Sequence, residues 1–122
     1  MRCPCLSGLP YGECCGPLHT GTATAPTAER LMRSRFSAFA VGDTAYLLAT
    51  WHRSTRPAQL ELDAGVRWYR LDIILTEGGG PLEHEGVVEF EAFARSPEGA
   101  WSQRESSRFQ REGGRWYYVE GR

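Results

Sequence analysis

Apolar residues recur at helical spacing between residues 27 and 52. Within TAERLMRSRFSAFAVGD, one face of a helix carries Leu31, Met32, Phe36 and Phe39. Thr27 is a suitable N-cap residue, and Gly42 is a suitable residue to end the helix. The next stretch, TAYLLATWH, follows Asp43 and has the composition of a second, shorter helix. This part of the chain therefore predicts two consecutive helices.

The apolar period changes to that of a β-strand in the second half of the chain. The alternating positions are Tyr69, Leu71, Ile73 and Leu75 in VRWYRLDIIL, and Val88, Phe90, Ala92 and Ala94 in GVVEFEAFAR. Two further strands, AWSQRESSRFQR and RWYYVEG, are joined by EGG, which favours a tight hairpin. Helices followed by an antiparallel meander predict an α+β fold.

The first 20 residues contain too few apolar side chains to fold unaided. They are Leu6, Leu9, Tyr11 and Leu18. Ordering each residue costs about 1–2 kcal/mol, so this N-terminal arm needs another source of stability. We therefore divide the chain into the arm, residues 1–20, and an α+β domain, residues 21–122.

The length and net charge of the chain argue for a small protein that is not specialised for binding nucleic acid or membranes. The chain has 122 residues and a formal net charge of −1, so it predicts a single globular domain without a strong field toward nucleic acid or anionic lipid. The sequence contains no apolar run of about 20 residues and no signal-peptide pattern at its start. We expect a cytoplasmic protein without a membrane span.

All four cysteines lie in the arm, as Cys3 and Cys5 and then Cys14 and Cys15. In a reducing compartment, such clustered thiols favour a metal site over disulfides, a redox centre or free thiols. Four thiolates in a tetrahedron favour zinc and leave no open coordination position. The spacing therefore predicts one structural Zn²⁺ per chain, which would also supply the stability that the arm lacks.

Several motifs resemble known families. The pattern C-x-C, eight residues and CC, with Ser7-Gly8, Tyr11 and Gly16, resembles the SEC-C zinc-binding motif, which also occurs on the SecA translocation motor. The segments LMRSRFSAF, ATWH, GVVEFEAFAR, ESSRF and RWYYVEG resemble the YchJ-like family of uncharacterised bacterial proteins. This resemblance implies a domain like nuclear transport factor 2 (NTF2): a curved sheet wrapped around helices as a cone with an internal cavity.

Two charged residues are candidates for the interior of that cone. Arg35 lies within the apolar stripe of the first helix, so its buried guanidinium needs a partner. Glu105 shares strand parity with Trp101 and Phe109, and we predict that it is the carboxylate that pairs with Arg35. Alternatively, Arg35 binds an anionic ligand.

Further candidates would give the cone a chemical role. His52, paired with Glu105 or Asp72, could act as the acid and base of an isomerase or dehydratase. Trp68 could stack on a ligand at the mouth of the cone. Each residue also has a purely structural interpretation, as packing, helix-end contacts or a solvated strand face.

Three functional hypotheses follow. We favour a non-catalytic module that meets a protein partner through the zinc arm or holds a ligand. The alternative is an enzyme or carrier for a small molecule, which requires a closed cavity of at least about 300 Å³ around Arg35, His52 and Glu105. A nucleic-acid-binding zinc module is disfavoured by the neutral charge. The exposed sheet of such a fold could also support a homodimer.

Overall fold

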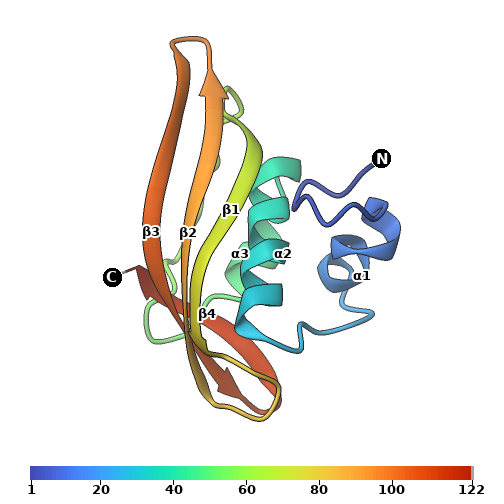
Figure 1. The fold of residues 1–122 in the computed structure, drawn as a ribbon, viewed down its shortest axis with the longest axis vertical. Helices are drawn as coiled ribbons and strands as arrows, with labels where there is room; N and C mark the ends of the chain where they lie inside the picture. Colours follow the sequence, from blue (N-terminus) through green and yellow to red (C-terminus); the bar gives the residue numbers. More distant parts are fainter. Residues whose placement is uncertain (122) are drawn as a thin grey trace.

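A computed structural model describes residues 1–121, and the resulting architecture is shown in Figure 1. The helical elements are η1 (Tyr11–Glu13), α1 (Cys15–His19), α2 (Ala28–Val41) and α3 (Thr44–Ala49). The strands are β1 (Arg67–Gly78), β2 (Glu85–Ser96), β3 (Gly99–Glu112) and β4 (Arg115–Gly121). The order of helices and strands is the α+β order that the sequence predicts.

The two main helices begin and end where the sequence places their caps. The Thr27 hydroxyl accepts a hydrogen bond of 3.1 Å from the backbone N–H of Arg30, and Gly42 ends α2 in the left-handed region at a φ of 79°. Asp43 caps α3 by accepting a 3.0 Å bond from the backbone N–H of Tyr46. No helix within residues 1–121 is long and apolar enough to cross a bilayer.

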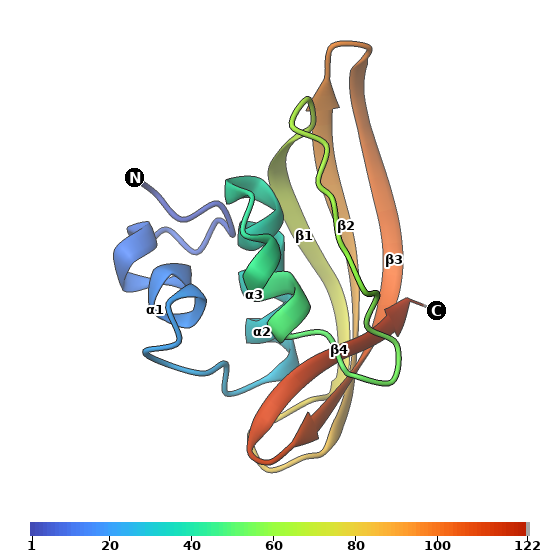
Figure 2. The same ribbon diagram turned by 180° about the vertical axis from the view of Figure 1, so that it is seen from behind.

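The four strands form one antiparallel sheet in the order β1-β2-β3-β4. β3 and β4 are joined by Gly113 and Gly114, whose φ values of 57° and 78° fit a type I′ turn, so the predicted hairpin is confirmed. The sheet curves along α2 and α3, and Figures 1 and 2 both show the arm on the side of α2 that is remote from the sheet. The molecule therefore has three layers.

The main core lies between α2 and the sheet. It includes Leu31 and Phe36 from α2, and Val88, Phe90, Ala92 and Phe109 from the strands. The predicted alternation of β2 is confirmed, because Val88, Phe90, Ala92 and Ala94 are all buried.

The predicted buried face of β1 is wrong at both ends. Tyr69 and Leu75 are 41% and 51% exposed, whereas Leu71 is buried and Trp68 packs against the core. The pairing of β1 with β2 shifts register between Trp68 and Arg70 and again between Ile73 and Leu75. Each irregularity changes which face the following side chains point to, so strict alternation does not hold along this strand.

The connection from the arm to α2 wraps around the end of the core. Ala25 is buried, and the indole N–H of Trp116 on β4 donates a 3.2 Å hydrogen bond to the Pro26 carbonyl. These contacts attach the connection to the sheet immediately before α2 begins.

Candidate metal centre

Backbone hydrogen bonds fold the arm into a loop that brings its two cysteine pairs together. The N–H of Cys3 donates to the Leu9 carbonyl at 2.9 Å, and that of Tyr11 donates to the Met1 carbonyl at 2.8 Å. Cys14 then precedes α1, and Cys15 is its first residue. A Cβ atom on Gly16 would lie 2.8 Å from the Tyr11 carbonyl oxygen, so the close turn requires glycine here.

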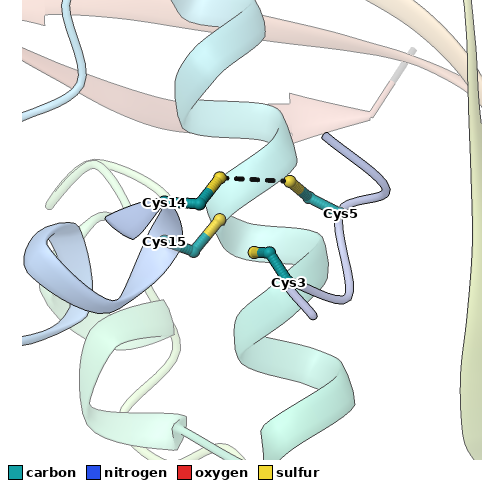
Figure 3. Close-up of side chains that lie close together, drawn as sticks. All are labelled: Cys3, Cys5, Cys14 and Cys15. Atoms are coloured by element: carbon teal, nitrogen blue, oxygen red, sulfur yellow. Dashed lines mark hydrogen bonds between the residues drawn. The ribbon is translucent and has the colours of Figure 1, made fainter. Parts of the chain in front are cut away.

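The four thiols converge on one point, as Figure 3 shows. Their Sγ atoms all lie within 4.8 Å of one another, and the Cys5 and Cys14 Sγ atoms are 3.6 Å apart. Each side chain is buried, with exposed fractions of 8% or less, and all four thiols are free. A buried cluster of four soft donors can hold a metal ion, as the spacing predicts.

A positive charge from α2 faces this cluster. The Arg30 guanidinium donates through Nη1 to the Cys15 Sγ and through Nη2 to the Cys14 Sγ, each at 3.4 Å. The Ser7 hydroxyl lies 3.1 Å from the Cys14 Sγ, within hydrogen-bonding distance. These groups place donors where thiolate charge would accumulate.

Contacts among the thiols also shift their pKa values in opposite directions. The hydrogen bond from Cys15 lowers the pKa of Cys5 to about 4, against the opposing effect of burial. The same bond raises the pKa of Cys15, and burial raises the pKa of Cys14. Among these three thiols, the contacts therefore favour the thiolate form most at Cys5.

Further contacts attach the arm to α2, and no motif in the sequence indicates them. The His19 Nε2 donates to the Ser34 carbonyl at 2.8 Å, so its Nδ1 accepts from the Tyr11 hydroxyl at 2.5 Å. Arg33 donates to the Cys5 carbonyl at 3.3 Å. Arg30, Arg33 and these contacts of His19 were not predicted, because the sequence does not show which face of α2 receives the arm.

The predicted ion pair between Arg35 and Glu105 is wrong. Arg35 Nη1 donates instead to the Leu47 carbonyl at 2.8 Å and to the Thr50 hydroxyl at 2.7 Å. Glu105 is on the predicted inner face, but its carboxylate accepts from the Gln103 side chain at 2.8 Å. Strand parity correctly gives the face of Glu105, but it does not fix the distance to a helix packed across the sheet.

His52 and Asp72 do not form the proposed acid–base pairs. The His52 Nε2 lies 2.9 Å from Glu112 Oε1, and Arg53 donates to the other oxygen of that carboxylate at 2.9 Å. Both bonds lower the pKa of Glu112, and the bond with His52 has the larger effect. Asp72 forms an exposed ion pair of 3.0 Å with Arg70. The pairing of His52 with either Glu105 or Asp72 is therefore wrong.

A cavity of about 240 Å³ does occur between α2 and the sheet. Arg35, Trp68 and Glu105 line it together, as the cone interpretation predicts. It is smaller than the expected 300 Å³, and His52 is absent from its lining because that side chain points to Glu112.

Comparisons with known proteins agree with both parts of this architecture. Residues 2–17 match the SEC-C motif, and residues 27–121 match the middle NTF2-like domain of YchJ. A solution structure of a SEC-C motif protein from Rhodopseudomonas palustris has a TM-score of 0.85 and 34% identity, covering 100% of this chain and 98% of that one. The resemblances noted in the sequence are thus confirmed.

Two relatives match nearly the whole of this chain. A UPF0225 protein of Corynebacterium glutamicum is 53% identical over 120 residues, covering 98% of this chain and 95% of its own. One from Corynebacterium efficiens is 54% identical over 122 residues, covering 99% and 92%. The chain therefore belongs to the UPF0225 family, with a SEC-C motif ahead of a YchJ-type NTF2-like domain.

Proposed function

We propose that the four cysteines bind one structural Zn²⁺ and that the arm ordered in this way is a docking surface for a protein partner, without catalysis of its own. The proposal is carried by one observation: four buried thiol sulfurs lie within 4.8 Å of one another at the base of a loop that is otherwise weakly apolar.

The donor set fits zinc in number, chemistry and spacing. Zinc bound to four thiolates at about 2.3 Å requires sulfurs about 3.8 Å apart, so this cluster needs only a slight contraction. The Cys5 and Cys14 Sγ atoms are already 3.6 Å apart. Both donor bonds of Arg30 would offset the net negative charge of a four-thiolate site. Both ring nitrogens of His19 form hydrogen bonds, to the Ser34 carbonyl and the Tyr11 hydroxyl, so neither is free to act as a zinc ligand.

Zinc would also supply the energy that the arm lacks. Structural zinc contributes on the order of 10–16 kcal/mol in small peptides, which together with the contacts of the arm to α2 would offset the cost of ordering the loop. A four-cysteine site has no position for substrate, so its role is structural.

The loop between the cysteine pairs provides the surface for a partner. Leu6 and Leu9 are 55% and 50% exposed there, and Leu6 has a left-handed backbone with a φ of 66°. Two exposed leucines on a loop pinned at both ends form a small, preorganised apolar contact, which lowers the entropic cost of binding.

A photo-crosslinking residue at position 9 tests the docking role in cells. We expect one specific cross-linked protein at this position and none from the same residue at position 82, which replaces the 89% exposed Leu82 in the connection between β1 and β2. The cross-link should disappear when Cys14 is replaced by serine, because the loop then loses its anchor. Identical products at positions 9 and 82, or a cross-link that survives Cys14→Ser, would contradict the docking role.

A further inference from the structure

The cavity between α2 and the sheet has an apolar wall and a charged end. Phe36 and Trp68 contribute aromatic surface, with ring centroids 6.3 Å apart in an edge-to-face arrangement. Arg35, Gln103 and Glu105 contribute polar groups. Figure 2 shows α2 and α3 against the curved sheet, the two layers that contribute the lining residues. A volume of about 240 Å³ suits a molecule smaller than a typical drug.

Arg35 carries a charge that no carboxylate neutralises within residues 1–121. Its side chain is 3% exposed, and its hydrogen bonds go to a carbonyl and a hydroxyl. Its guanidinium carbon lies 4.6 Å from the ring centroid of Tyr118 and 5.2 Å from that of Trp51. Burial lowers the pKa of Arg35 to about 10, so the group remains cationic at neutral pH. A buried cation with only neutral partners is costly to the fold.

The guanidinium also has donors to spare. Within residues 1–121, Arg35 donates hydrogen bonds only through Nη1. Its Nε and Nη2 atoms form no hydrogen bond, yet neither belongs to the side-chain polar atoms that are completely buried without a partner. These two donors therefore keep access to open space, and the residue lines the cavity. A pair of adjacent N–H groups in a fixed plane matches the two oxygens of a carboxylate.

The lining provides no carboxylate that forms an ion pair with Arg35. Its one acidic residue, Glu105, accepts from Gln103 at 2.8 Å and from the Ser107 hydroxyl at 3.4 Å. The acceptor that Arg35 lacks must then come from outside. We infer that this cavity, the cone pocket, binds a small carboxylate with an apolar body, with Arg35 holding the carboxylate and the aromatic wall covering the body.

Phenylacetate and its neutral amide form a matched pair of probes for the cone pocket. We expect phenylacetate to shift the indole N–H resonances of Trp51 and Trp68, which line the pocket, in a titration followed by NMR. The Trp116 indole should not move, since it donates to the Pro26 carbonyl outside the pocket. Phenylacetamide should bind at least tenfold more weakly, because it brings no charge to Arg35.

Two variants separate binding from folding. Arg35→Met removes the charge at similar volume and should weaken phenylacetate binding at least tenfold, while Tm stays equal or rises, since a buried unneutralised charge is lost. Ala92→Leu fills the cone pocket from β2 and should block binding with Arg35 intact. Arg104→Met, at an exposed arginine paired with Glu89, is the control and should leave binding unchanged.

The outcomes are decisive in each direction. Binding of the acid over the amide, lost in Arg35→Met or in Ala92→Leu and kept in Arg104→Met, supports the inference. Equal binding of acid and amide, or no binding of either at millimolar concentration, overturns it. If Arg35→Met fails to fold, two results still test the inference. They are the preference of the native chain for the acid over the amide and the loss of binding in Ala92→Leu.

Discussion

Replacing Cys15 with serine is expected to reduce bound zinc from about one equivalent to nearly none and to release the arm from α2. The Cys15 side chain is fully buried and its Sγ lies within 4.8 Å of the other three sulfurs, so the replacement leaves only three sulfur donors at the site. A hydroxyl does not replace a thiolate on zinc, and the binding energy of a structural site is also the folding energy of its loop. Elemental analysis and hydrogen exchange of residues 1–20 measure the two effects.

Ser7→Ala is the matched control for this experiment. It lies in the same loop and removes a hydroxyl 3.1 Å from the Cys14 Sγ, but it removes no ligand. We expect this variant to keep its zinc and its protected amides. An arm in Cys15→Ser that exchanges as slowly as in the native chain would show that the metal does not hold it.

Phe109→Ala is expected to destabilise the domain by about 3–5 kcal/mol, because it leaves a cavity in the main core. Phe109 is fully buried on β3, and its ring lies 5.9 Å from that of Tyr118. For a chain of this size the loss corresponds to a fall in Tm of roughly 10–20 °C. Thermal or urea unfolding measures it directly.

Phe93→Ala on the neighbouring strand provides the comparison. Phe93 points to the other face of the sheet, where the Arg70 guanidinium lies 4.9 Å from its ring centroid. It is half-buried, and we expect a loss of about 1 kcal/mol. Equal losses at the two positions would mean that the sheet does not bury the face of Phe109 in preference to the face of Phe93.

Much of the fold could be predicted because local signals and tertiary packing agree. Thr27, Gly42 and Asp43 mark the helix ends, and the alternation of β2 matches its burial throughout. β1 shows the limit of such reasoning. Its two register shifts depend on pairing with β2, so they leave no signature in the strand's own sequence, and Tyr69 and Leu75 were assigned to the wrong face.

The candidate metal centre and the cavity were likewise predicted only in part. The four cysteines are close in sequence, so their spacing alone predicts the cluster. Arg30 and His19 join it only because the arm lies on α2, a long-range contact that no local pattern encodes. Arg35 and Glu105 were correctly placed at one cavity, but their predicted contact depends on a helix-to-sheet distance that strand parity does not contain.

X-ray absorption spectroscopy at the zinc edge, on purified protein of measured metal content, tests the central claim most directly. The account predicts one zinc per chain with four sulfur neighbours at about 2.3 Å and no nitrogen or oxygen in the first coordination shell. A metal-free protein with a well-ordered arm, or a metal coordinated by nitrogen or oxygen, would contradict it.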